Sequence, residues 1–224
     1  MSYGEFLNST TYKSVYHLAD GDNANGDSSL DLTLSNTTTA VGKFGTCQQT
    51  TGDNGVLTCA SEFGITKTSG FTYHIWYKHT SSGEYDTGSY ILFHGISSQL
   101  MAPSIIWEEN NTRLYCPLYT TGPIVSPWTM NTTSFDLFTF TYTSAGYVSI
   151  YVNSSFLGTK YEVPTGTSPD TARFSLGSYL WDAPRRRYIN GYYDETIVCN
   201  YPWTDAEIKK YYNQAKGRIN PGMV

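Results

Sequence analysis

Charged residues are scarce in this 224-residue chain: Asp, Glu, Lys and Arg make up 15% of it, against about 25% in a typical soluble domain. The formal net charge is -5, and the one dense basic cluster is Arg185-Arg186-Arg187. Binding to a polyphosphate needs clustered cations that release counterions, so we expect no nucleic-acid partner. The three arginines are interpreted as a solvated loop or strand edge.

Long apolar runs are also missing. No stretch approaches the roughly 20 apolar residues of a membrane-spanning helix, so no membrane span is expected. Residues 1–6 contain neither the basic segment nor the apolar segment of a signal peptide. We therefore expect no cleaved export signal in this chain.

Cysteine is limited to four residues, Cys47, Cys59, Cys116 and Cys199, and none of them forms a Cys-x-x-Cys pair. This spacing indicates neither a zinc ribbon nor a thioredoxin-type site. Cys47 and Cys59 flank the turn-rich residues 50–55. Two alternatives stay open for this pair: a disulfide across a hairpin in an oxidising compartment, or buried free thiols.

Motifs of common enzyme classes are lacking as well. The four histidines show no His-Glu-x-x-His spacing, and the chain has no Gly-x-Ser-x-Gly elbow and no glycine-rich phosphate loop. His74 and His94 lie inside predicted strands, where a hydrogen-bonded structural imidazole is the favoured interpretation. We predict that the chain is not an enzyme.

Aromatic residues, in contrast, are plentiful at 16%, and they alternate. Residues 71–78 place Phe71, Tyr73, Ile75 and Tyr77 on one face, as expected for a strand with one buried face. Further strands are predicted at 90–94, 104–107, 113–116, 138–142, 147–152, 172–176 and 192–198, with turns at 110–111, 144–146, 153–155 and 190–191. Residues 20–54 are rich in loop-forming residues. The pattern predicts an all-β sandwich or barrel without an internal domain boundary.

The C-terminal part carries the one helical signal. Thr204-Asp205-Ala206-Glu207 is a capping box, and Ile208, Tyr211, Tyr212 and Ala215 fall on one helical stripe. Gly217 is predicted to end the helix in a left-handed conformation. Trp203 is expected to act as a staple for this helix, whereas Trp76 is assigned to packing in the sheet.

The order of these segments resembles laminin G-like, concanavalin A-like jelly-roll domains over nearly the whole chain. The resemblance rests on the segments 15–18, Asp27-Ser28-Ser29, 32–34, Gly42-Lys43-Phe44-Gly45, 71–78, 147–153 and 190–208. It implies a two-sheet antiparallel jelly-roll sandwich with one short C-terminal helix, and a single domain over residues 1–224. It also implies one concave surface and a family dominated by binding and adhesion.

Calcium is the expected cofactor. Asp20, Asp22, Asp27 and Asp31 crowd one loop, and hard cations bind several carboxylate oxygens. The resemblance implies a structural Ca²⁺ held by Asp27 and Asp194. Two observations keep an alternative open: the family's Asp-Ser-Ser loop here continues as Leu30-Asp31-Leu32, and aspartates also cap turns through their own side chains.

Some relatives with this fold are glycoside hydrolases, whose retaining members need two carboxyl groups about 5 Å apart. The laminarinase-type relatives supply them from one strand as Glu-x-Asp-x-x-Glu, a motif that this sequence lacks. Glu84 and Asp86 have suitable spacing but lie in a Gly/Ser-rich loop. Glycosidase activity is therefore the least favoured function.

Aromatic side chains beside loops are the candidates for binding sugar, since sugar rings stack their C–H faces on Trp or Tyr. Neighbouring amides and carboxylates would hydrogen-bond the hydroxyl groups, which are costly to desolvate without partners. The predicted ligand-binding residues are Trp107, Glu109, Asn111, Tyr115, Trp128 and Trp181.

The sequence thus favours a non-catalytic recognition or adhesion module, most readily for glycans, displayed on a virion or cell surface. The alternative is a structural virion protein, such as a phage decoration or tail-associated protein, that binds other subunits. The expected partners are a glycan or other surface proteins, including further copies of the chain in a homo-oligomer. A virion-surface or extracellular location is expected, since a virion protein needs no export signal.

Overall fold

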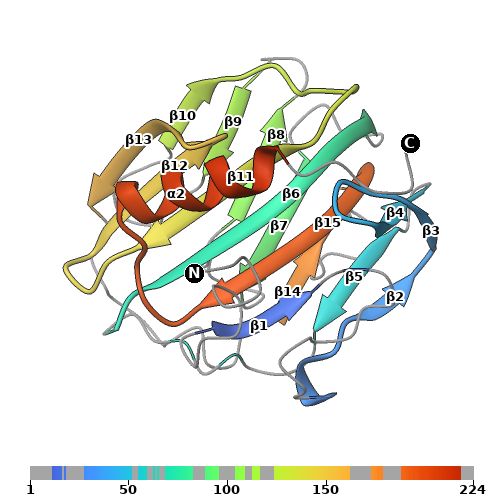
Figure 1. Cartoon of the computed structure of the whole chain (residues 1–224), viewed down its shortest axis with the longest axis horizontal. Helices are drawn as coiled ribbons and strands as arrows, with labels where there is room; N and C mark the ends of the chain where they lie inside the picture. The colour runs from blue at the N-terminus through green and yellow to red at the C-terminus, as the bar shows by residue number, and fades with distance from the viewer. Residues whose placement is uncertain are drawn as a thin grey trace.

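Two antiparallel sheets stacked face to face form the body of the protein (Figure 1). The computed structural model describes residues 12–16, 18, 28–51, 55–59, 63, 65, 69–82, 89–95, 104–108, 113–116, 124–161, 173–178 and 188–217. Every strand pair in both sheets is antiparallel, which confirms the predicted jelly-roll architecture.

The eight-stranded sheet has the order β13-β12-β11-β6-β15-β4-β3, and β1 also pairs with β15. Its strands are β1 (Tyr12–Tyr16), β3 (Thr37–Val41), β4 (Thr46–Thr50), β6 (Phe71–Ser82), β11 (Asp136–Tyr142), β12 (Tyr147–Val152), β13 (Ser155–Tyr161) and β15 (Ile189–Cys199). The long strands β6 and β15 lie side by side at its centre, so they form the backbone of the sheet.

The seven-stranded sheet has the order β10-β9-β8-β7-β14-β5-β2. Its strands are β2 (Thr33–Ser35), β5 (Val56–Cys59), β7 (Ser89–Gly95), β8 (Ser104–Glu108), β9 (Arg113–Cys116), β10 (Ile124–Pro127) and β14 (Arg173–Leu176). A short 3-10 helix, η1 (Ser28–Leu30), precedes β2. Strands β2, β3 and β4 lie within residues 20–54, so the interpretation of that whole region as loop-rich was wrong. Its Thr-rich runs form strands: β2 and β3 lie at sheet edges, and β4 lies between β3 and β15.

The main core fills the space between the two sheets. Phe71, Tyr73, Phe140 and Phe174 meet there, with Tyr73 stacked on Phe174 at 6.0 Å between ring centroids. Phe71 and Phe140 also stack, at 6.1 Å. The predicted inward alternation of residues 71–77 is confirmed, because this aromatic face is buried against the opposite sheet.

Helix α2 (Asp205–Lys216) covers part of the outer face of the eight-stranded sheet, which it crosses in Figure 1. Trp76 and Leu137 of the sheet pack here against Ile208 and Tyr211 of the helix. The prediction of a single buried face for residues 71–78 was therefore wrong: His74 and Trp76, on the other face, are buried too. Sequence alternation could not show this, because the covering helix comes from the far end of the chain.

The start of α2 follows the prediction, but its end does not. Thr204 Oγ1 accepts the Glu207 N–H at 3.3 Å, and the Glu207 carboxylate accepts the Thr204 N–H at 2.7 Å, which is the expected capping box. Trp203, just before the cap, is buried. Gly217 has φ -85° and ψ -2°, a right-handed conformation, so the predicted left-handed end was wrong.

Two predicted turns had different outcomes. Asn153 and Ser154 form a tight turn between β12 and β13 with φ values of 51° and 64°, the positive values that a two-residue hairpin of type I′ requires. Asn190-Gly191, in contrast, lies within β15 at a register shift. The predicted turn was wrong there, because a β-bulge also uses Asn and Gly.

The cysteines Cys47, Cys59 and Cys199 are free and buried. Cys59 of β5 belongs to the main core, while Cys47 of β4 lies in the other sheet, so the structure favours free thiols over the hairpin disulfide. None of the helices in the described parts of the chain is long and apolar enough to cross a membrane.

Candidate functional site

The edge hairpin β12–β13 presents a row of aromatic and hydroxyl side chains. Because Val148, Ile150 and Val152 face the main core, the alternate residues of β12 lie on the outer face. Cross-strand pairing then matches Tyr147 with Tyr161, Ser149 with Thr159 and Tyr151 with Phe156. We call the outward-facing Tyr147, Ser149, Tyr151, Phe156, Thr159 and Tyr161 the aromatic row; Tyr151 is its one buried member, at 5% exposure.

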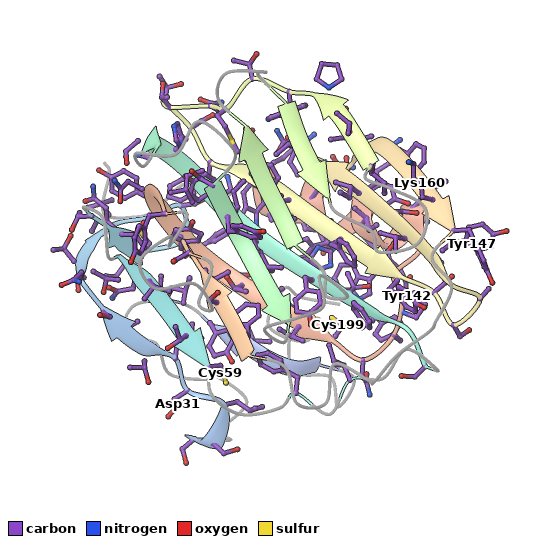
Figure 2. All side chains as sticks on the ribbon, turned by 180° about the vertical axis from the view of Figure 1, so that it is seen from behind. Asp31, Cys59, Tyr142, Tyr147, Lys160 and Cys199 are labelled. Atoms are coloured by element: carbon purple, nitrogen blue, oxygen red, sulfur yellow. The ribbon has the colours of Figure 1, made fainter. Side chains whose placement is uncertain are left out.

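Three members of the aromatic row are large and strongly exposed: Tyr147 at 49%, Phe156 at 52% and Tyr161 at 45%. Tyr147 and Tyr161 meet edge to face, with 5.5 Å between ring centroids and an interplanar angle of 66°. Figure 2 shows Tyr147 projecting from the rim of the molecule, with Lys160 on the same edge. Large apolar groups this exposed are typical of contact surfaces.

Hydroxyl groups separate the two aromatic pairs. Ser149 Oγ donates to Thr159 Oγ1 at 3.0 Å, and Thr159 Oγ1 donates to the Val148 carbonyl at 2.8 Å. Ser149 Oγ therefore keeps acceptor capacity toward an approaching donor. The row alternates aromatic pair, hydroxyl pair and aromatic pair along the edge.

The far end of the row is fixed to helix α2. Phe156 packs on Tyr151 with ring centroids 5.4 Å apart, and Tyr151 Oη donates to Asp205 Oδ1 at 2.5 Å. Tyr147 and Tyr151 are four residues apart on one strand, about 13 Å at 3.3 Å per residue. This span suits a short oligosaccharide better than a single sugar ring.

The chemistry of the aromatic row is that of stacking and hydrogen bonding. Aromatic faces contact the C–H groups of a sugar, and Tyr, Ser and Thr hydroxyls can both donate to and accept from its hydroxyl groups. The same surface could contact another protein, because Tyr and Phe are enriched in protein interfaces. The two uses differ in their partner, which binding experiments resolve.

The residues predicted to bind sugar are only partly placed by the structure. Trp107 lies in β8 and pairs with Leu114, and Tyr115 lies in β9 and pairs with Ile106 and Val125. The side chains of Trp107 and Tyr115 lie outside the described residues, as do Glu109, Asn111 and Trp181. Their role in ligand binding stays a prediction.

Trp128 is the one predicted ligand-binding side chain that the structure describes. It follows β10, is half-buried and packs against the main core. Burial raises the pKa of the nearby Asp136 carboxyl, and a hydrogen bond from Asn153 opposes that rise. The Asn153 Nδ2 group donates to Asp136 Oδ1 at 2.6 Å. The Trp128 Nε1 group is buried without a hydrogen-bond partner, so the contacts of Trp128 within the protein are packing contacts.

Asp194, a predicted calcium ligand, is buried in β15 beneath the Gly42-Lys43-Phe44-Gly45 turn. Its Oδ2 accepts the Phe44 N–H at 2.9 Å, and the backbone of Lys43 and Glu195 also hydrogen-bonds it. Burial raises the pKa of Asp194 to about 6, against these hydrogen bonds and the charge of Lys43. The carboxylate holds the turn in place through N–H donors, and Gly42 permits the contact: a Cβ there would lie 2.5 Å from Asp194 Oδ2.

A metal site is not assembled by the described residues alone. Among them, no group of three or more His, Cys, Asp and Glu side chains is placed to hold a metal ion. Asp27, the predicted partner of Asp194, lies outside the described residues. The calcium site therefore stays a prediction.

His74 has the structural role that the sequence favoured. Its Nδ1 lies 2.8 Å from Thr139 Oγ1, and its ring packs against Trp203 with centroids 4.0 Å apart. Burial lowers the pKa of His74 to about 3. The imidazole is therefore neutral at pH 7 and belongs to the packing between the sheet and α2. The side chain of His94 lies outside the described residues.

The aromatic row itself was missed in the sequence. Its signal was half visible, since residues 147–152 alternate between Tyr or Ser and aliphatic side chains. Residues 155–161 carry no clear alternation, however, and nothing local places them at the edge of a sheet. The row becomes a site only when β12 and β13 pair.

Two stacked antiparallel sheets with a capped helix across one outer face define a lectin-type β-sandwich. The family model of the concanavalin A-like lectin/glucanases superfamily matches residues 50–209. The chain belongs to this superfamily. A comparison with curated protein sequences gave no significant match.

Solved structures share the fold at low sequence identity. Domain 4 of AbnA, a GH43 extracellular arabinanase from Geobacillus stearothermophilus solved with arabinotriose, is 16% identical with a TM-score of 0.68 and covers 90% of this chain and 98% of its own. The binding domain of Paraclostridial Mosquitocidal Protein 1 is 10% identical with a TM-score of 0.68, covering 92% of this chain and 53% of its own. Trypanosoma rangeli sialidase, solved with 2,3-difluorosialic acid, is 16% identical with a TM-score of 0.72, covering 95% and 34%.

This chain thus spans about half of the toxin chain and a third of the sialidase chain. The neighbours include binding domains and domains of glycoside hydrolases. At these identities the likeness defines the fold alone, and the ligand depends on the residues of this chain.

Proposed function

We propose that the chain is a non-catalytic recognition module that binds glycans through the aromatic row. The observation that carries the proposal is the alternation along β12–β13 of two aromatic pairs with a hydroxyl pair between them. Tyr147, Phe156 and Tyr161 are exposed by about half, so a sugar ring can reach their faces. Superfamily membership and neighbours solved with sugars support the same class of ligand.

The test is a glycan array followed by titration calorimetry with each oligosaccharide that binds. Arabinotriose and a sialylated oligosaccharide are included as probes, because one structural neighbour was solved with arabinotriose and another with 2,3-difluorosialic acid. Tyr161→Ala and Phe156→Ala each remove one exposed ring. A stacked ring contributes about 0.5–1.5 kcal/mol, so each variant should raise the Kd between about 2-fold and 12-fold.

Val41→Ala is the matched control, because Val41 is 59% exposed on β3, at the other edge of the same sheet. Its Kd should equal that of the unmodified protein. If no glycan on the array binds, the proposal of glycan binding is wrong. Equal Kd values for Tyr161→Ala, Phe156→Ala and the unmodified protein would place sugar binding elsewhere.

Display on a virion or cell surface is the setting that we propose for this module. The alternative function is that of a structural virion protein whose aromatic row contacts other subunits. The exposed Phe156 favours this alternative, because phenylalanine cannot hydrogen-bond sugar hydroxyl groups. Sedimentation velocity separates the two functions. Self-association that Phe156→Ala abolishes, without any glycan binding, would support the structural function.

Catalysis is tested separately, because two of the neighbours belong to glycoside hydrolases. We propose that the chain binds glycans without cleaving them. Incubation with the glycans that bind, followed by a reducing-end assay, should give no product. Release of reducing ends would overturn this part of the proposal.

A further inference from the structure

A second surface lies on the outer face of the eight-stranded sheet, beyond the C-terminal end of α2. Lys78 Nζ lies 4.1 Å from the Tyr192 ring centroid and 5.4 Å from that of Phe135. The two rings also contact each other, with centroids 6.4 Å apart. The ammonium group of Lys78 therefore caps a notch between two aromatic rings.

Lys43 repeats this arrangement beside Trp76, the residue two positions before Lys78 on β6. Lys43 Nζ lies 4.6 Å from the Trp76 ring centroid and 5.5 Å from that of Phe44, and it donates to the Lys216 carbonyl at 3.3 Å. Trp76 and Lys78 are two residues apart on one face of β6, about 7 Å. We call Lys43, Phe44, Trp76, Lys78, Phe135 and Tyr192 the lysine–aromatic strip.

The strip is accessible because the helix ends beside it. α2 buries Trp76 and ends at Lys216, whereas Lys78, Phe135 and Tyr192 are each partly exposed. Gln49 pairs with Tyr192 and is also partly exposed, so an amide lies next to the aromatic notch. Amide, ring and ammonium groups together are what a charged sugar requires.

The charge of the strip is positive although the chain carries 19 acidic and 14 basic residues. Three carboxylates act on the surrounding groups: Asp194 on Lys43, Asp136 on Tyr212 and Glu195 on Tyr211. All three are buried, at 1%, 4% and 1% exposure. Asp194 is directed to the Phe44 N–H, and Glu195 Oε1 accepts the Tyr211 hydroxyl. The lysine ammonium groups are thus the charges that the strip offers to a ligand.

We propose that the lysine–aromatic strip binds an anionic sugar, carboxylated or sulfated, with its anion on Lys78 and its ring beside Tyr192. This is a second surface, on the other side of α2 from the aromatic row, and it does not depend on glycan binding there. The low dielectric of the rings beneath Lys78 strengthens its attraction for an anion. Stacked lysines also lose little side-chain freedom on binding, since the rings already hold them.

Titration calorimetry with matched probes tests the proposal: a short oligogalacturonate, its neutral methyl ester, and a sulfated oligosaccharide. The oligogalacturonate or the sulfated probe should bind, and the methyl ester should bind at least tenfold more weakly. The better of the two anionic probes identifies the anion. Lys78→Gln should raise the Kd of that probe about tenfold or more, because a charge-assisted hydrogen bond is lost. Lys78→Arg should retain most of the affinity.

Lys210→Gln removes an equal charge from the exposed face of α2 and should leave the Kd unchanged. Tyr161→Ala should also leave it unchanged, which separates this surface from the aromatic row. Lys43→Gln provides a second test if Lys78→Gln lowers the melting temperature. Equal binding of acid and methyl ester, an unchanged Kd in both lysine variants, or no binding of either anionic probe would overturn the proposal.

Discussion

The buried histidine beneath α2 should make the protein sensitive to mild acid. His74 is fully buried, contacts Thr139 and Trp203, and has its pKa lowered from 6.5 to about 3 by burial. The unfolded chain binds a proton at His74 near pH 6.5, whereas the folded chain does so only near pH 3. Stability is therefore complete above pH 6.5 and falls as the pH decreases toward 3.

The magnitude follows from the size of this shift. Each pH unit between the unfolded and folded pKa values removes about 1.4 kcal/mol from the free energy of unfolding. At pH 5, which is 1.5 units below the unfolded value of 6.5, the loss should be about 2 kcal/mol. Asp194 acts in the opposite direction, since its raised pKa of about 6 makes protonation favour the folded state. The effect of His74 therefore has to be isolated.

A variant whose side chain at position 74 cannot be protonated isolates the effect of His74. His74→Asn keeps a polar atom that can reach Thr139 but no titrating ring, and its smaller side chain adds a constant loss from the cavity under Trp203. Urea denaturation of both proteins from pH 4.5 to 7.5 gives the difference in unfolding free energy. This difference should narrow by about 2 kcal/mol between pH 7.5 and pH 5. Parallel curves, or an imidazole that titrates above pH 5 by NMR, would refute the reasoning.

Three further predictions concern stability. Thr204→Ala removes the cap of α2 and should lower the free energy of unfolding, measured by urea denaturation, by about 1 kcal/mol. Gln214→Ala, on the exposed face of α2, should lower it by less than about 0.5 kcal/mol. Equal losses in the two variants would contradict the capping role of Thr204. Gly42→Ala places a Cβ 2.6 Å from Cys47 Cβ and 2.5 Å from Asp194 Oδ2, so its melting temperature should fall, and an unchanged value would contradict the tight packing. Asp27 and Asp194 are the predicted ligands of a calcium ion, so calcium should raise the melting temperature of the protein above its value in EDTA. Coincident melting curves would contradict the predicted calcium site.

Local chemistry explains what the sequence could predict. The alternation of residues 71–78 and 147–152 and the capping box at Thr204 each involve neighbours within a few residues, so they are readable without the fold. The superfamily followed from the order of such segments and is confirmed by the match over residues 50–209.

Tertiary packing determines the features that the sequence could not predict. The second buried face of β6 depends on where α2 docks, and the aromatic row depends on β13 lying at a sheet edge. Strand β13 is hard to read because it includes Gly158, where a Cβ would lie 2.9 Å from Ile124 Cγ2 of the opposite sheet. The lysine–aromatic strip joins Lys43, Lys78 and Tyr192, which are far apart in the chain and share no local pattern.

The central position of β15 has a consequence for how the chain folds. β15 pairs with β6 on one side and with β4 on the other, and β1 also pairs with it. Without residues 189–199 the eight-stranded sheet therefore separates into β13-β12-β11-β6, the pair β4-β3, and an unpaired β1. Strands β6 and β4 would then present unpaired edges, the kind of surface that promotes aggregation. During synthesis, the ribosome makes most of the chain before this gap can close. Folding should thus be completed late, and a chaperone that shields strand edges would raise the yield.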